Sequence, residues 1–190
     1  EPAVGGFSWM QEMVDYRRYE PIIFNKLIFG FYARGVFTQG RDADSINQYI
    51  GYAGAVRGYN GTSYAPTQTC LTDNPANYYR CNPMIGSSAW QSSVELRAPF
   101  YAGGGGGVPL PPVEMFIFGD IGQAWFTGQT VIFKPQSTLD PEYQRGFITA
   151  HGIGARVNLF GAAIMSWAFV WAHDINPQHP YVQFSLYAPF

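Results

Sequence analysis

Three short segments of the chain combine charged residues with glycines or aromatic residues in a way that could build a buried polar site. Two of their carboxylates, Glu95 and Asp120, fall on the polar faces of two predicted strands. Buried carboxylates on neighbouring strands are costly unless a cation neutralises them. The chemistry in question is therefore ion pairing. The segments are Val-Arg-Gly-Tyr at 56–59, Val-Glu-Leu-Arg at 94–97 and Phe-Gly-Asp-Ile-Gly at 118–122.

The cation that neutralises these carboxylates can come from two places. Arg57 lies between glycines that would permit the tight backbone needed to fold its loop inward, and a guanidinium can bind a carboxylate through two hydrogen bonds. Alternatively, Arg57 is a solvated loop residue, and the carboxylates pair with Arg97 or Arg156. The charge pattern alone leaves both arrangements open.

No other group of residues indicates a catalytic or metal site. His151, His173 and His179 are scattered and favour surface or interfacial positions. Cys70 and Cys81 have no further Cys or His at metal-ligand spacing. We therefore expect no catalytic residue, no cofactor and no metal, and the protein is not expected to be an enzyme.

The two cysteines lie in one polar stretch of the chain. Two cysteines in a single surface loop of an exported protein favour a local disulfide. Two free thiols are the alternative, so Cys70 and Cys81 form a candidate disulfide.

The elements that must position these residues are strands, because apolar residues recur with a period of two along most of the chain. In 163–172, Met165, Trp167 and Phe169 alternate with smaller residues, which predicts one bulky and one small face. In 90–98, polar and charged residues repeat at every second position. That pattern is costly in a dry core but favourable toward the wet lumen of a transmembrane barrel.

Most of the predicted strands reach the ~9–11 residues that cross a bilayer at a tilt. Short Gly- or Pro-rich turns alternate with long loops, which is typical of an outer-membrane barrel. The longest connection, at about 40–84, is expected to be functional. We predict an all-β fold, a single antiparallel transmembrane β-barrel segment over 1–190, with strands at 7–19, 24–37, 85–100, 113–126, 144–160, 162–172 and 181–190.

The composition excludes several other classes of protein. The chain has 190 residues, of which 47% are hydrophobic, 17% aromatic and only 13% charged, with a net charge of -2. Such an aromatic chain is not disordered, and it lacks the basic clusters of a nucleic-acid-binding protein. It also lacks the ~18–20 consecutive apolar residues of a membrane-spanning helix.

The three segments, in this order, resemble the BamA-type outer-membrane assembly and secretion superfamily, the bacterial surface antigen family. In that family a long extracellular loop carries a Val-Arg-Gly-Phe/Tyr motif and folds into the lumen. There its Arg binds the Asp of a Phe/Gly-x-Asp-x-Gly strand, near a Glu of the preceding strand. The resemblance assigns the loop motif to Val56, Arg57, Gly58 and Tyr59, and its partners in the barrel wall to Glu95, Phe118, Asp120 and Gly122.

The end of the chain resembles the C-terminal targeting signal of the same family. Phe184, Leu186 and Phe190 alternate on one side of the last predicted strand. The resemblance therefore implies that these residues direct the chain to the bacterial outer membrane.

A complete member of the family has sixteen strands, preceded by periplasmic POTRA domains or another module. Seven strands cannot close an antiparallel bacterial barrel, which needs an even number. Either an eighth strand is hidden near 1–7, or the chain is the C-terminal half of a barrel; we favour the second. The segments 15–19 and 110–114 are closest to barrels fused behind a TolB-like propeller.

The function implied by this resemblance is the insertion or translocation of other proteins at the outer membrane, by strand pairing at an openable seam. The alternative is a non-transporting barrel that anchors a cell-envelope complex. A passive pore is disfavoured, because the tyrosine-rich loop would plug the lumen. The expected partners are outer-membrane lipid, other envelope proteins or an N-terminal periplasmic module, and a second barrel half, but no nucleic acid.

Overall fold

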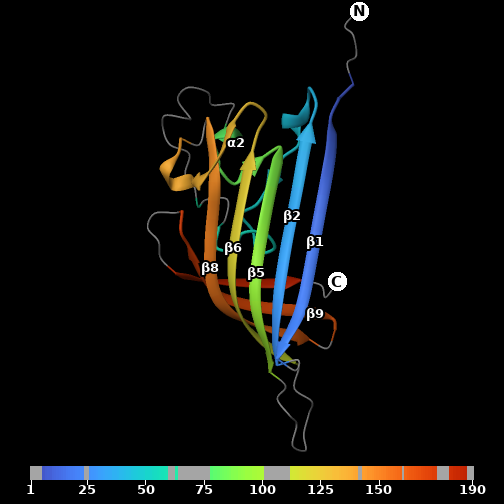
Figure 1. Ribbon diagram of the computed structural model, residues 1–190, viewed down its shortest axis with the longest axis vertical. Helices are drawn as coiled ribbons and strands as arrows, with labels where there is room; N and C mark the ends of the chain where they lie inside the picture. The colour runs from blue at the N-terminus through green and yellow to red at the C-terminus, as the bar shows by residue number, and fades with distance from the viewer. Residues whose placement is uncertain are drawn as a thin grey trace, which may run out of the picture.

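The computed structural model describes residues 6–23, 26–59, 63, 78–100, 112–140, 143–159, 161–174 and 180–187. Its main element is one eight-stranded sheet, in the order β1-β2-β5-β6-β8-β9-β10, with β7 attached to β8 (Figure 1). The strands of this sheet are β1 (Met10–Ile23), β2 (Leu27–Gln39), β5 (Ser88–Phe100), β6 (Val113–Trp125), β7 (Thr130–Pro135), β8 (Gln144–Leu159), β9 (Ala163–Ala172) and β10 (Tyr181–Tyr187).

Neighbouring strands along this path pair antiparallel, which confirms the predicted fold class. The period of two sorts each strand into two faces. In β9, Ala168 and Val170 are buried on the inner face, whereas Trp167 and Phe169 are exposed on the outer face. The sheet curls so that β9 and β10 lie behind β2, β5 and β6, but β1 and β10 do not pair with each other in the described part of the chain (Figure 1).

The two ends of the sheet are open edges. Among the described residues, β1 pairs only with β2, and β10 pairs only with β9. All fourteen residues of β1 are exposed, on both faces of the strand. An edge of this length presents a row of unpaired backbone groups to any strand that can reach it.

Besides shifts of one to three residues at other strand ends, three features of the sheet differ from the prediction. The chain between the first two predicted strands, 20–23, belongs to β1, because Pro21 lies on the edge strand, where a missing N–H is tolerated; the register shifts directly after it, between Pro21 and Ile23. The predicted strand at 85–100 is split at Ser87 into β4 (Ile85–Gly86), which pairs with β3 (Gln48–Tyr49), and β5. The unpredicted β7 pairs parallel with β8, and its sequence has no alternation that would reveal a strand.

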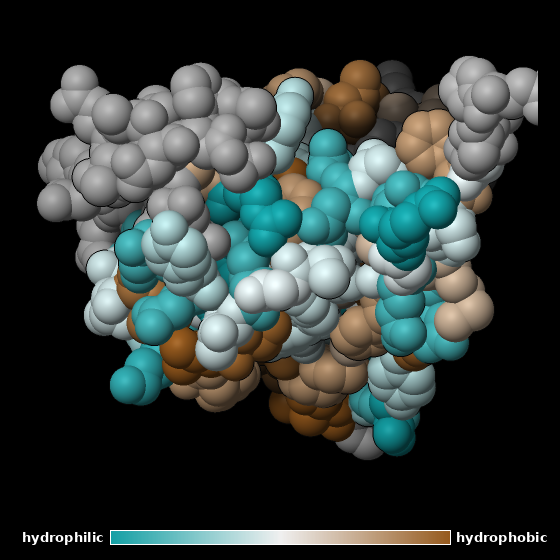
Figure 2. Space-filling view, turned by 90° about the horizontal axis from the view of Figure 1, so that it is seen from above, coloured by the Kyte–Doolittle hydropathy of each residue, from teal (hydrophilic) through white to brown (hydrophobic). Residues whose placement is uncertain are grey.

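The described part of the predicted 40–84 loop contains only short elements, namely η1 (Ala43–Ser45), β3 and α2 (Tyr78–Cys81). Its segment 50–59 supplies Ile50, Val56 and Tyr59 to the buried apolar cluster, which it shares with β6, β8 and β9. Viewed from above, hydrophilic residues cross the middle of the molecule and hydrophobic ones gather along the lower margin (Figure 2). The loop thus covers the concave face of the sheet.

Among the described helices, none combines the length and the apolar character that a membrane-spanning helix requires. A second short 3-10 helix besides η1, η3 (Gln136–Thr138), follows β7 and packs against β8.

Candidate functional site

Arg57 is the centre of a buried ion-pair cluster between the loop and the sheet. Its Nε and Nη2 atoms donate to the two carboxylate oxygens of Asp120, each at 2.7 Å, and its backbone N–H donates to the same carboxylate at 3.0 Å. Its Nη1 donates to Glu95 Oε1 at 2.5 Å, and Nη2 also donates to Ser93 Oγ at 2.9 Å. Arg57, Glu95 and Asp120 are all less than 9% exposed. Charge-assisted, bidentate bonds of this kind are the strongest that side chains form.

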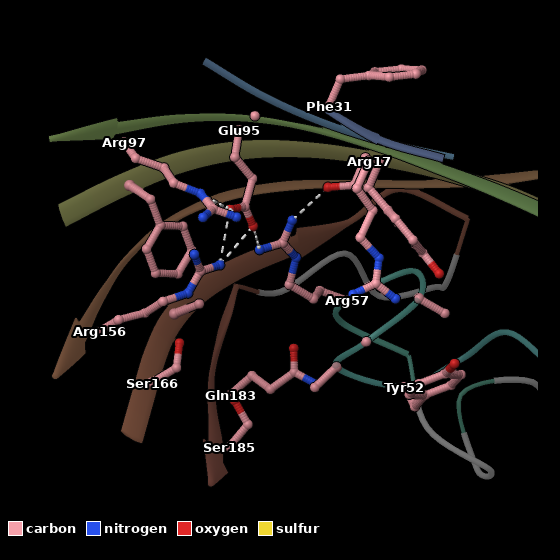
Figure 3. A pocket seen from close by; sticks show the side chains of 18 of the residues that line it. Arg17, Phe31, Tyr52, Arg57, Glu95, Arg97, Arg156, Ser166, Gln183 and Ser185 are labelled. Carbon is pink, nitrogen blue, oxygen red and sulfur yellow. Dashed lines mark hydrogen bonds and ion pairs between the residues drawn. The ribbon is translucent and has the colours of Figure 1, made fainter. Parts of the chain in front are cut away.

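Glu95 accepts from three arginines, so both of the sources considered from the sequence contribute. Besides Arg57, the Nη2 atoms of Arg97 and Arg156 each lie 2.7 Å from its carboxylate oxygens. Figure 3 shows the three guanidinium groups converging on this one carboxylate. Arg156 also reaches Glu114 at 3.1 Å, on the same face of the neighbouring strand. Three arginines and the three carboxylates of Glu95, Glu114 and Asp120 thus balance in charge.

Aromatic and glycine residues of the wall form the surface against which the loop motif around Arg57 packs. The Arg57 guanidinium carbon is 3.5 Å from the centre of the Phe118 ring, a cation–π contact. The Phe118 ring lies in turn over Gly152, where an added Cβ would come within 2.7 Å of it. Gly122 likewise leaves room for the Val56 side chain, because a Cβ at Gly122 would lie 2.7 Å from Val56 Cγ2.

Gly58 brings the loop backbone against β9 and β10. Its φ of +91° lies in the left-handed region that favours glycine. A Cβ at this position would also lie 2.5 Å from Val170 Cγ1. The Gly58 N–H donates to Gln183 Oε1 of β10 at 3.3 Å.

Tyr59 forms a second anchor, at the ends of β8 and β9. Its hydroxyl donates to the backbone oxygen of Thr149 at 2.7 Å and lies 3.3 Å from Asp174 Oδ2. The Asp174 backbone N–H donates to the same hydroxyl at 3.2 Å. Burial, together with the Asp174 carboxylate, raises the pKa of the Tyr59 phenol, so this group stays protonated as a donor.

The charges around Arg57 keep its guanidinium ionised. Burial by itself would lower the Arg57 pKa, but hydrogen bonding to Asp120 and the charges of Asp120 and Glu95 outweigh burial and raise this pKa. The cluster lines a cavity of about 530 Å³ on the inner side of the sheet. In Figure 3, Gln183 and Ser185 of β10 face this cavity from the side opposite Glu95, and the Phe31 ring points away from it.

Two further buried charged residues, Asp174 and Arg145, carry only an unspecific signal in the sequence. Asp174 is the second residue after β9, and besides Tyr59 it binds the backbone N–H of Thr149 at 2.9 Å. Arg145 of β8 is fully buried and donates to the backbone oxygens of Arg80 and Asn82, both at 2.6 Å, and to Gln129 Oε1 at 2.8 Å. In the sequence, each of the two is a single charged residue near the end of a largely apolar strand. Such residues are common and do not indicate burial.

The remaining predicted residues stand apart from this cluster. Phe184 and Leu186 are 55% and 60% exposed on the outer face of β10, and Phe190 lies outside the described residues. Cys81 is buried and disulfide-bonded, and Cys70, the only other cysteine of the chain, also lies outside the described residues.

The arrangement around Arg57 is suited to holding the loop against the wall. Each carboxylate is held by arginine rather than placed beside a nucleophile. In the described part of the chain, no three His, Cys, Asp or Glu side chains gather in a way that could hold a metal ion. The chemistry of the site is therefore that of a neutralised structural ion-pair network.

Comparison with known proteins identifies the family. The model of the Omp85 superfamily domain, the superfamily that includes BamA-type barrels, matches residues 10–186. No curated protein and no solved structure matches the chain. Nearly all of the chain is covered by the family model, and the strands that carry the Arg57 cluster lie within the match. The chain therefore belongs to the Omp85 superfamily of bacterial outer-membrane proteins.

Proposed function

We propose that this barrel segment assists the insertion or translocation of other proteins at the outer membrane, without chemical catalysis. The family works on proteins at this membrane. The observation that carries the proposal is the buried network of Arg57, Glu95 and Asp120, which fixes a long loop to the inner face of the sheet. In this proposal the 40–84 loop lies in the lumen, and Val56, Arg57, Gly58 and Tyr59 lock it there.

The lock acts as a brace across several strands. Residues 57–59 bind Ser93 and Glu95 of β5, Asp120 of β6, Thr149 of β8 and Gln183 of β10. A brace that spans these strands fixes the curvature of the wall next to β10. We infer that this curvature keeps the edge of β10 in a conformation with which a strand of the protein being inserted, the client, can pair.

The open edges support a mechanism based on strand pairing. The exposed edges of β1 and β10 each have one row of backbone groups available for a further strand. We propose that additional strands of the barrel, in the same polypeptide or in a second copy, pair with β1 and meet β10 at a seam that can open, so that this chain acts as a C-terminal barrel half. Pairing with an incoming strand at such an edge is β-augmentation. Phe184, Leu186 and Phe190 would serve as the signal that directs the barrel to the membrane.

The experiment replaces Arg57 by Ala in the whole protein that contains this chain, in cells that lack the wild-type copy. Immunoblots follow the amount of the protein in the outer membrane and of other β-barrel or secreted proteins. We expect client proteins to fall several-fold at an equal amount of the variant. The control is Arg41→Ala in the same loop, because the Arg41 side chain is 68% exposed.

The outcomes separate this proposal from the anchoring function. Normal client levels with an intact variant would contradict the insertion or translocation role. Normal client levels with loss of a co-purifying envelope complex would instead support a non-transporting anchor. If Arg57→Ala does not accumulate, Tyr59→Phe provides a milder variant of the same lock.

A further inference from the structure

The outer face of the sheet contains a groove of about 430 Å³ in the middle of the wall, away from both open edges. It lies between two adjacent rows of cross-strand neighbours. One row runs through Val94, Gly119, His151 and Trp171, and the other through Phe29, Leu96, Ile117 and Ile153. Because these rows point away from the Arg57 cluster, the groove faces the side of the wall that contacts lipid.

Gly119 forms the floor of this groove. Its cross-strand neighbours Val94 and His151 carry side chains, so the missing side chain leaves a gap between them. A Cβ at Gly119 would meet only Val94 Cγ2, at 3.6 Å, which is ordinary contact. The backbone at Gly119 is not in the left-handed region. Hence a larger residue would fit the strand and fill the groove.

One end of the apolar groove carries a pair of histidines. His151 Nδ1 lies 2.6 Å from His173 Nε2, and the His151 ring stacks on Trp171 with 5.5 Å between ring centres. Whichever ring donates in this contact, the accepting ring must carry its own proton on its other nitrogen. In either arrangement this contact uses one nitrogen of each imidazole.

We propose that this groove binds a phosphate-bearing membrane lipid, with an acyl chain over Gly119 and the phosphate at His151 and His173. The apolar lining suits a hydrocarbon chain and excludes a water-soluble anion. The imidazole N–H groups are complementary to phosphate oxygens. The groove is also continuous with the lipid-facing surface of the wall, where Phe169 and Trp167 are exposed. This inference rests on the outer-membrane location and is independent of the transport role.

The test uses the whole protein in detergent micelles and two photoactivatable probes with a diazirine in one acyl chain. One probe is phosphatidylglycerol, and the other is diacylglycerol, which lacks the phosphate. Mass spectrometry of peptides locates the labelled residues. We expect phosphatidylglycerol to label the groove residues Val94, Ile117 and Ile153 several-fold more than diacylglycerol does, and unlabelled phosphatidylglycerol to compete.

Three variants make the test specific. Gly119→Leu should reduce labelling of the groove at least fivefold, whereas Ala155→Leu, which places the same leucine side chain on the outer face of β8 outside the groove, should not. His151→Gln should bring phosphatidylglycerol labelling down to the diacylglycerol level. Retained heat-modifiable migration on gels checks that each variant is folded.

Two results would overturn the proposal. Labelling spread evenly over the outer face, unchanged by Gly119→Leu, would show that no lipid site exists in the groove. Equal labelling by both probes, unchanged by His151→Gln, would show that the phosphate is not recognised.

Discussion

Arg57 and Arg145 are both buried arginines that connect the long loop to the sheet, but they do so in opposite ways. Arg57 extends from the loop to the wall and is neutralised by Asp120 and Glu95. Arg145 extends from the wall to the returning end of the loop, and its hydrogen bonds within the described part of the chain go to oxygens of carbonyl type, on Arg80, Asn82 and Gln129. Among the described residues, no carboxylate forms an ion pair with Arg145.

The difference concerns what each arginine leaves behind when it is removed. Loss of Arg57 leaves two buried carboxylates with one cation fewer, which is a charge problem inside the wall. Loss of Arg145 leaves unpaired carbonyl oxygens near the loop. Hydrating these oxygens costs less free energy than leaving a carboxylate buried without its cation. The first should therefore weaken the barrel as a whole, and the second should loosen the loop locally.

The largest effect is expected for Arg57→Ala. Removal of one partner of a buried ion pair costs about 3–5 kcal/mol, because the partner charge stays buried. Urea unfolding of the whole protein, followed by tryptophan fluorescence in micelles, measures this loss. Arg41→Ala, the exposed control, should leave the midpoint unchanged, and an equal midpoint for both variants would contradict the role of Arg57.

Glu95→Gln should follow, because it removes the charge shared by three arginines and keeps the side-chain size. Hydrogen bonds to charged groups contribute about 1.5–3 kcal/mol, and we expect a loss in this range. Glu114→Gln is the matched control, since Glu114 is half-buried and reaches Arg156 at 3.1 Å and Arg97 only at 3.8 Å. We expect it to cost less than about 1 kcal/mol. The same unfolding measurement compares them, and a larger cost for Glu114→Gln would be inconsistent with Glu95 as the centre of the network.

Arg145→Met tests the other side of the comparison. Each buried carbonyl left unpaired costs about 1–3 kcal/mol, and access of water should limit the total to this range. Hydrogen exchange measured by mass spectrometry should speed up around 80–82 and stay unchanged in β5 and β6. Faster exchange throughout these strands would mean that Arg145 supports the wall as Arg57 does.

The smallest effect is expected for Tyr59→Phe. It removes the hydroxyl bonds to Thr149 and Asp174 but keeps the buried ring, so about 1 kcal/mol should be lost in urea unfolding. Tyr52→Phe serves as a control, because its ring is 41% exposed. A loss as large as that of Arg57→Ala would place the main anchor at Tyr59.

Much of the fold could be predicted because a two-sided sheet imposes period two on the sequence. This period places Trp167 and Phe169 on the outer face of the sheet and Glu95 on its inner face, as the structure has them. β7 could not be found, because it is short, exposed and paired parallel over few residues. The C-terminal end of β1 differs from the prediction because Pro21 is a turn residue in most contexts but is tolerated at an edge.

The site residues, too, could be predicted only in part from the sequence. Arg57 and its partners could be named because the three motifs, in their order, resemble those of the family. From charge alone, Arg97 and Arg156 were competitors of Arg57, whereas the structure joins them all at Glu95. Asp174 and Arg145 could not be named, because their partners are backbone groups and uncharged side chains such as Tyr59 and Gln129, and such contacts depend on the folded path of the chain.

The most direct test of the loop-to-wall lock is a double-mutant cycle between Arg57 and Asp120 in the whole protein. The free energy of unfolding in urea is measured for the wild type, Arg57→Ala, Asp120→Ala and the double variant. A bidentate buried pair predicts a coupling energy of at least about 2 kcal/mol, with the double variant little worse than either single one. A coupling energy near zero, with additive losses, would contradict the claim that this pair holds the loop to the wall.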